Sequence, residues 1–266
     1  MNGAIRDSFP ITPATIACLA ALALATPAGA GSADGESSAA SWRIDATAYA
    51  WFQGVSGDVT ALGHKVNIDA SPSDLLSYAN FPAQGVVNVL HGRLVAIADA
   101  SWTPLTVNTA HPSLLPLPPG MAVEVQYSPV IATAEAGYRV ANPRGYAVDA
   151  LAGARYWYLG ATLTLTPSPT GSSVSKSTDW FDPLVGARVQ KALLPRLEGT
   201  LLGDVGGFGV GANLDYQVVA ALGLTLAPRW SVDAAWRQIY ADYETAQLHS
   251  KTTESGLVAG VTFKIH

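Results

Sequence analysis

Cysteine is nearly absent from this chain, which carries a single one at position 18. Cys18 lies inside an apolar stretch, 14–25, that is too short to span a bilayer. The small residues PAGA follow at 27–30, so 1–30 is predicted to be a secretory signal peptide cleaved after Ala30. The mature chain would then contain no thiol, which excludes disulfides and cysteine chemistry.

Charged residues are also scarce. They make up 13% of the 266 residues, whereas about a quarter is usual in soluble domains. The net charge of −5 argues against nucleic acid as a partner. Beyond the N-terminus the sequence has no run of 18 or more apolar residues, so no membrane helix is expected. A glycine-rich chain with little charge and no such run fits a transmembrane β-barrel.

The stretch 197–236 organises the chain, and its centre is the glycine-rich sequence GDVGGFGVG at 203–211. Polar and apolar residues alternate on both sides of it, and a period of two is typical of strands. Because glycine tolerates positive φ, the unit is predicted to be a strand, a tight bend and a second strand. A phosphate-binding loop would need a following Lys-Ser or a helix, whereas ANLD follows here, so no nucleotide or other cofactor is expected.

Alternation of this kind predicts ten strands, most of them long enough to cross a membrane at a tilt. They lie at about 42–53, 82–90, 93–102, 121–140, 146–165, 180–192, 196–206, 213–227, 230–245 and 255–265. Short turns connect them at one end. Longer loops are predicted at the other, at 54–80, 103–120, 166–178 and 246–252, an asymmetry typical of outer-membrane barrels.

We therefore predict an all-β fold, a closed antiparallel transmembrane β-barrel of about ten strands, with eight or twelve as alternatives. The predicted division is a signal peptide at 1–30, a flexible leader at 31–41 and the barrel at 42–266. Within the loop at 54–80 we expect a small hairpin around Gly63 and a capped helical turn after Ser71.

Two further local features lead to predictions. Glu124 and Gln126 are out of phase with Glu135 and Arg139, which predicts a β-bulge at the intervening Pro129. Five of the seven tryptophans lie near predicted strand ends, and we expect these to anchor the membrane interface. They are Trp42, Trp51, Trp102, Trp180 and Trp230.

Since lipid faces the apolar side of each strand, the polar side is predicted to line the lumen. The inward charges nearly balance, and a barrel of this size has little interior space, so we expect a paired ionic core that mostly plugs it. The predicted network contains Arg43, Asp45, Arg93, Asp99, Glu135, Arg139, Asp149, Arg155, Asp182, Arg188, Glu198, Asp204, Asp215, Asp233 and Arg237, with Lys264 also facing inward. Removal of Asp204 is expected to leave a buried arginine without its acidic partner.

Residues that could support catalysis or metal binding are few. His249, Ser250 and Glu254 resemble the His/Ser/acid set of a hydrolase, but adjacent residues on a loop rarely align for such chemistry, and a polar surface loop is favoured. Asp242 and Glu244 could bind a divalent ion near lipopolysaccharide, although a solvated rim is favoured. No pair of histidines has metal-ligand spacing, so neither a catalytic nor a metal site is predicted.

Several short sequences, taken together and in order, carry a family resemblance. They are YAW at 49–51, GDVT at 57–60, SDLL at 73–76, ADA at 98–100, GARYW at 153–157, DPLVGAR at 182–188, GDVGGFGVG at 203–211, DYE at 242–244 and GVTF at 260–263. With them, most of the mature chain resembles a family of largely uncharacterised outer-membrane β-barrel proteins of Gram-negative bacteria. The resemblance implies a signal peptide, a barrel and the outer membrane, and it implies no assigned reaction.

The predicted function is a structural or passive small-solute transport role in the bacterial outer membrane. The alternatives are an outer-membrane barrel enzyme that hydrolyses lipid or peptide, and a soluble β-barrel binding protein. The expected partners are outer-membrane lipid, lipopolysaccharide and the barrel-assembly machinery.

Overall fold

The computed structural model describes residues 41–61, 64–80, 82–109, 122–142, 146–166, 173–246 and 248–265. The predicted signal peptide with Cys18, its cleavage site and almost all of the predicted leader lie outside these residues. Within the described ranges, no helix is long and apolar enough to span a membrane.

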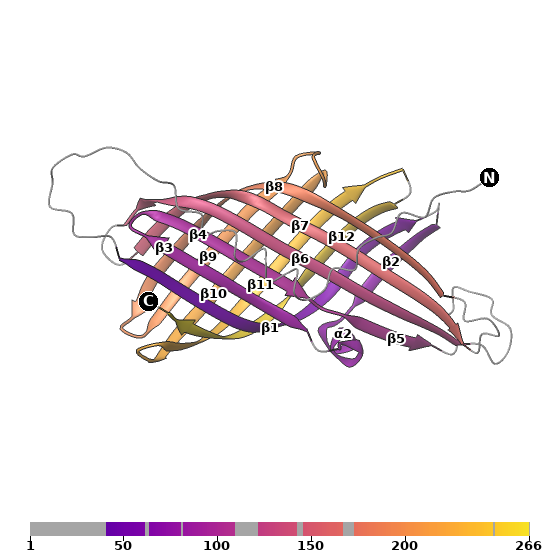
Figure 1. Cartoon of the computed structure of the whole chain (residues 1–266), viewed down its shortest axis with the longest axis horizontal. Helices are drawn as coiled ribbons and strands as arrows, with labels where there is room; N and C mark the ends of the chain where they lie inside the picture. The colour runs from indigo at the N-terminus through magenta and orange to yellow at the C-terminus, as the bar shows by residue number, and fades with distance from the viewer. Residues whose placement is uncertain are drawn as a thin grey trace. The chain divides into compact units, whose positions relative to one another are not determined.

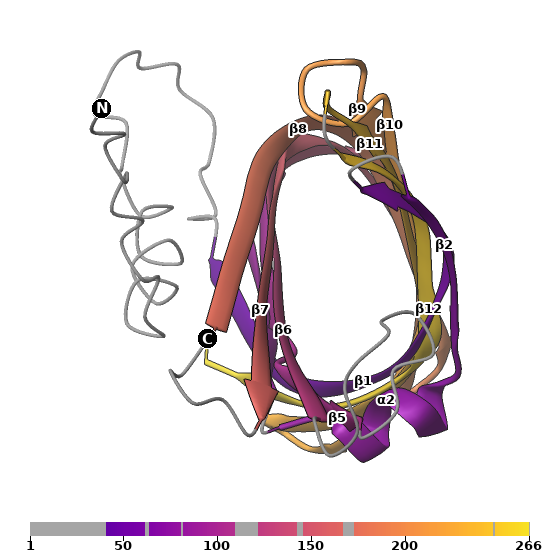
Figure 2. The same cartoon turned by 90° about the vertical axis from the view of Figure 1, so that its right-hand side faces the viewer.

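Ten antiparallel strands form a closed ring, shown from the side in Figure 1 and nearly end-on in Figure 2. They are β1 (Trp42–Ala61), β3 (Ala83–His91), β4 (Leu94–Trp102), β6 (Ala122–Ala141), β7 (Tyr146–Thr166), β8 (Ser173–Leu194), β9 (Leu197–Gly207), β10 (Leu214–Ala227), β11 (Trp230–Glu244) and β12 (Leu248–Lys264). The first strand pairs with β3 on one side and with β12 on the other, so the sheet has no free edge around the ring. The predicted closed antiparallel barrel of ten strands is confirmed.

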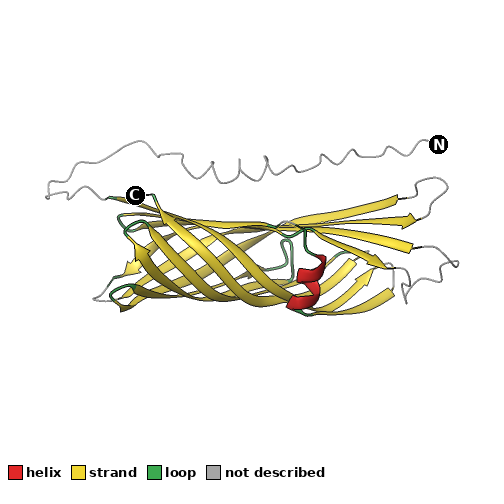
Figure 3. Cartoon of the chain, turned by 90° about the horizontal axis from the view of Figure 1, so that it is seen from below, coloured by secondary structure: helices red, strands yellow, loops and turns green. Residues whose placement is uncertain are grey.

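Two short strands and a helix lie toward the long-loop end of the ring, where Figure 1 labels them, and Figure 3 shows the helix in red. Strand β2 (His64–Ala70) pairs with the far half of β1, and β5 (Leu105–Thr109) pairs with β6. Helix α2 (Pro72–Tyr78) follows β2 and begins with a capping box, in which Ser71 and Asp74 each bond the other's backbone N–H. The pairing of the two arms of the predicted hairpin and the helical turn after Ser71 are confirmed, while Gly63 itself lies outside the described residues.

All four of the predicted loops are shorter than expected. Strand β1 continues to Ala61, residues 105–109 form β5, β8 already begins at Ser173, and β12 already begins at Leu248. Prolines suggested the loop at 103–120, and Ser/Thr-rich composition suggested the loop at 166–178. The backbones of these added strand segments are nevertheless paired with neighbouring strands, which satisfies their N–H and C=O groups.

The predicted bulge at Pro129 is wrong. Strand β6 stays in register with β7 from Ala122 to Arg139, and the only shift in that pairing follows Arg139. Glu124 and Gln126 are out of phase because they project from the outer face, where they hydrogen-bond each other at 2.6 Å. What changes near Pro129 is the partner strand, from β4 to β5.

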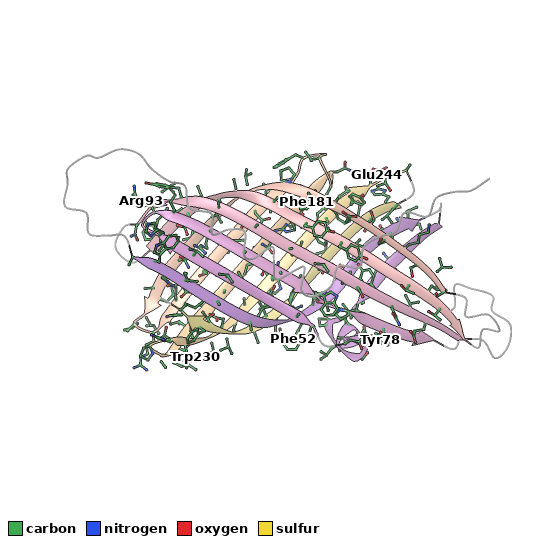
Figure 4. All side chains as sticks on the ribbon, viewed as in Figure 1. Phe52, Tyr78, Arg93, Phe181, Trp230 and Glu244 are labelled. Carbon is green, nitrogen blue, oxygen red and sulfur yellow. The ribbon has the colours of Figure 1, made fainter. Side chains whose placement is uncertain are left out.

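The outer surface of the barrel is apolar and its interior is polar. On β10, for example, Leu222 and Leu224 are 48% and 41% exposed, whereas Asp215 and Gln217 of the same strand are buried. Figure 4 shows the labelled side chains of Phe52, Phe181 and Trp230 on the outer surface. Soluble proteins have an apolar interior and a polar surface, whereas this arrangement is reversed, as in transmembrane β-barrels.

The tryptophans divide between the two faces. Trp42 and Trp230 are about half exposed at strand starts, as anchors would be. Trp51 and Trp180, which were predicted to be anchors, are instead only 6% and 7% exposed and pack inside the lumen. The crowding of aromatic residues suggested an interfacial girdle. However, Trp51 and Trp180 lie an even number of positions from the inward residues Thr47 and Asp182 of their own strands, which places both indoles on the inner face.

Candidate functional site: the closed lumen

Arg155 of β7 lies at the centre of the lumen and is fully buried. Its guanidinium donates to Thr133 at 3.0 Å, to both carboxylate oxygens of Asp204 at 2.9 Å, and to Asp215. Asp204 and Asp215 are also fully buried at their side chains, so the cation and its two acids are held away from water. Charge-assisted bonds of this kind are roughly twice as strong as neutral ones.

The glycine-rich turn brings these two acids together. Asp204 belongs to β9 and Asp215 to β10, and the turn between them contains Gly207 and Gly209, with φ of 83° and 74°. Gly186 of β8 lies directly opposite Asp204 in the sheet, where an added Cβ would come within 2.9 Å of the Asp204 Cβ. Its missing side chain leaves Arg155 a path across β8 to Asp204.

A chain of hydrogen bonds continues from Asp204 to the opposite wall. Gln217 donates to Asp204 at 2.9 Å and accepts from Arg237 at the same distance. Arg237 in turn donates to Tyr49 and Asp99, each at 2.8 Å. The connected layer therefore crosses the lumen from β7 through β9, β10 and β11 to β1 and β4. We call it the central layer.

Aromatic side chains cover the central layer on its long-loop side. Trp157 donates to Asp215 at 2.8 Å, and Trp180 donates to Asp182 at 2.8 Å. The Trp180 ring stacks between those of Trp157 and Tyr243, with centroid distances of 5.6 and 3.8 Å. These rings belong to a buried cluster with Trp51, Ile131 and Ile239, which fills the lumen there with apolar atoms.

The backbone of the β9–β10 turn is fixed to the same cluster. The Ala212 N–H donates to Asp182 at 2.6 Å, and Ala212 is fully buried. Asp182 therefore binds a backbone amide and an indole, and in the described chain it forms no ion pair.

A second ionic cluster lies nearer the short-turn end. Asp149 is fully buried and accepts from Arg139 at 2.7 Å and from Arg188 at 2.9 Å. Arg188 also reaches across the lumen from β8 to Asn88 of β3, at 2.7 Å. This second crossing narrows the lumen on the other side of the central layer.

The remaining residues of the predicted network have smaller parts. Arg43 and Asp45 pair at 2.8 Å at the mouth. Asp233 accepts from Thr262 at 2.6 Å, Glu198 accepts from Gln190 at 3.3 Å, and Lys264 donates to Thr225 at 3.3 Å. Glu135 is buried in the lumen, but no hydrogen-bond partner reaches its Oε1 in the described chain.

The placement of Arg93 is a correction. It lies in the exposed turn between β3 and β4, at the short-turn end in Figure 4, with its guanidinium 5.5 Å from the Tyr138 ring on the outer face. Gly92, with φ of 61°, turns the chain just before it, so the inward phase of β4 does not extend to this residue.

Sequence reasoning missed several neutral members of the central layer, among them Thr133, Gln217 and Tyr49. Each lies an even number of positions from a charged inward residue of its own strand, Tyr49 for example being four from Asp45. That even spacing is the sequence signal that these neutral residues also face the lumen. The charged residues were selected because an unpaired charge is the most costly group to bury.

The candidate hydrolase set is not assembled. Ser250 is buried on the inner face of β12, and the adjacent His249 projects from the opposite face, where its Nε2 lies 3.3 Å from Asp242. Asp242 is also paired with Lys251 at 3.0 Å. Among the described residues, no group of three metal-ligating side chains lies close enough together to hold a metal ion.

A cavity of about 280 Å³ occupies the lumen on the short-turn side of the central layer. Arg43 and Lys264 line it toward the mouth, and Tyr49, Asp99 and Arg237 line it at the central layer. Arg155, Trp157 and Trp180 do not contribute to its lining. The cavity thus stops where the network crosses the barrel.

Comparison with known proteins shows the fold. No family model and no curated protein sequence matches the chain. Among solved structures, the outer-membrane protease OmpT from Escherichia coli is 13% identical, with 84% of this chain and 97% of that chain covered and a TM-score of 0.50. The attachment invasion locus protein Ail of Yersinia pestis is 12% identical, with 82% and 97% covered and a TM-score of 0.34. Neisserial surface protein A is 14% identical, with 84% and 97% covered and a TM-score of 0.32. The chain has the β-barrel fold found in bacterial outer-membrane proteins.

Proposed function

We propose that this chain is a structural β-barrel protein of the bacterial outer membrane whose lumen is closed to passive diffusion. The single observation that carries the proposal is the central layer, in which Arg155, Asp204 and Asp215 are shielded from water in mid-barrel. A pore would need hydrated charges along a continuous path, whereas here each nitrogen of the guanidinium donates to a protein acceptor.

The location follows from the two surfaces of the barrel. Its apolar exterior requires lipid, and only a closed sheet satisfies strand backbones there. By the usual asymmetry, the short-turn end, with the mouth of the cavity, faces the periplasm, and the long-loop end faces outward. The proposed partners are outer-membrane lipid, lipopolysaccharide and the barrel-assembly machinery, after removal of 1–30 as a signal peptide.

Liposome swelling with solutes of graded size tests the closure. Liposomes that contain the folded protein should swell no faster than protein-free liposomes, even in the smallest sugar or amino acid. The variant Trp236→Ala is a control for loss of an outer-surface side chain. Trp236 lies beside Leu257 on the outer surface of the barrel, so its removal leaves the lumen unchanged and swelling should stay at the wild-type rate. Rapid swelling with the wild-type protein would favour the alternative role, passive transport of small solutes.

Hydrolysis of lipid or peptide is the second alternative from the sequence, and the geometry gives it less support. A hydroxyl nucleophile needs a base within hydrogen-bond reach. His249 and Ser250 face opposite sides of β12. If hydrolysis were detected, an unchanged rate in Ser250→Ala would place the activity elsewhere in the barrel.

A further inference from the structure

The cavity on the periplasmic side of the central layer is large enough for a small organic molecule. Its volume is about 280 Å³, and each water in the liquid occupies about 30 Å³. Apolar side chains form much of its wall, among them Val86, Leu90, Ile97, Leu202 and Val219. A pocket that combines an apolar wall with a few polar groups at its inner end is the usual form of a small-molecule site.

Glu135 lies at the inner end of this cavity with one carboxyl oxygen, Oε1, that lacks a hydrogen-bond partner. The residue is only 4% exposed and lines the cavity, yet its Oε1 has no hydrogen bond and the described chain forms no salt bridge to it. A buried polar atom without a hydrogen bond is costly, and a ligand that donates to it would remove that cost.

The nearby arginines donate no hydrogen bond to Glu135. Arg155 is committed to Asp204 and Asp215, and Arg188 to Asp149 and Asn88. Arg237, on the other side of the cavity floor, donates to Gln217, Tyr49 and Asp99. The inner end of the cavity therefore carries a carboxyl oxygen without a hydrogen-bond donor, whereas each guanidinium nitrogen of these three arginines already has an acceptor.

We propose that this cavity binds a small organic ammonium ion, a primary amine on a short apolar chain, with its charged end at Glu135. The ammonium group supplies the missing donors and the counter-charge, and the alkyl chain lies against the wall of Val86, Ile97 and Val219. A metal ion is a poorer match, since the described residues offer it no cluster of three ligands. An organic anion would find no unpaired base at the floor. This site goes beyond the proposed structural role and does not depend on the lumen being closed to solutes.

The test is binding of n-butylammonium to the folded protein in detergent micelles, measured by titration calorimetry, with n-butyrate and n-butyramide as probes of equal length. Wild-type protein should bind the amine and neither of the other two. Glu135→Gln, which keeps the shape and removes the charge, should weaken binding at least tenfold. Glu198→Gln is the matched control, because Glu198 lines the same cavity but is already bonded to Gln190, and it should change the affinity less than twofold.

A second variant keeps the proposal testable if Glu135→Gln does not fold. Val219→Trp fills the cavity from its wall and leaves the carboxylate in place, so it should also abolish amine binding. Absence of amine binding to the folded wild type, equal binding of butyrate, or unchanged affinity in Glu135→Gln or in Val219→Trp would each overturn the proposal. Because these titrations use micelles, their outcome is independent of the swelling result.

Discussion

Replacing Arg155 with methionine should be the most damaging single change in the barrel interior. The side chain is fully buried and forms hydrogen bonds with Thr133, with both oxygens of Asp204 and with Asp215. Methionine fills similar space but leaves two facing carboxylates without their shared cation. Removing one partner of a buried ion pair costs about 3–5 kcal/mol. Since Arg155 serves two acids, we expect a loss of about 5 kcal/mol in the free energy of unfolding.

The assay is urea unfolding of the protein folded in lipid vesicles, followed by tryptophan fluorescence, with heat-dependent gel mobility as a check of barrel closure. Arg93→Met is the matched control, since Arg93 is an exposed turn residue and should change stability by less than about 0.5 kcal/mol. A decrease in the free energy of unfolding below about 1 kcal/mol in Arg155→Met, or equal decreases in the two variants, would refute the reasoning. Removing a buried cation shared by two acids should destabilise the barrel by more than that.

Three further outcomes are expected in the same unfolding assay. Asp204→Ala should cost about 3 kcal/mol, less than the loss of Arg155, because Asp215 still neutralises the guanidinium; a loss equal to that of Arg155→Met would count against shared pairing. Gly186→Val should lower the free energy of unfolding by about 1–3 kcal/mol, because the added side chain overpacks against Asp204. Gly203→Ala should be tolerated, since its Cβ would meet the nearest atom at 3.8 Å. Similar losses in the two variants would contradict the role of Gly186. Leu222→Arg on the lipid face should cost about 2–4 kcal/mol and Leu226→Arg, close to the β10–β11 turn, about 0–1 kcal/mol; equal values would argue against a membrane centred near Leu222.

The period-two pattern was sufficient to predict the ring of strands and the inward face. On β10, Asp215 and Gln217 alternate with Tyr216 and Val218. Because lipid surrounds the barrel, the apolar residues must face outward and the polar residues must face the lumen. The pattern failed where strands run beyond the apolar belt, as at the start of β8, because both faces meet water there and the sequence carries no contrast between them. At β5 the short alternating run lies among prolines, which favoured a loop.

The pairing inside the lumen could not be derived from the sequence. Arg188 and Asn88 are 100 positions apart, and their contact depends on which strands face each other across the closed ring. Likewise Asp204 was expected to pair with an arginine, but the partner could be assigned to Arg155 only once Gly186 was seen to lie between them. Neutral members such as Gln217 and Tyr49 carry no charge that demands a partner, so nothing in the composition singled them out.

Single-channel conductance in planar bilayers tests the closed lumen most directly. The folded wild-type protein, with insertion verified by heat-dependent gel mobility, should show no long-lived open state. The triple variant Tyr49→Ala/Trp51→Ala/Arg237→Ala removes the far half of the central layer together with the indole that covers it, and it should produce small conductance steps. Large, stable channels in the wild type, unchanged in the triple variant, would contradict closure by this layer.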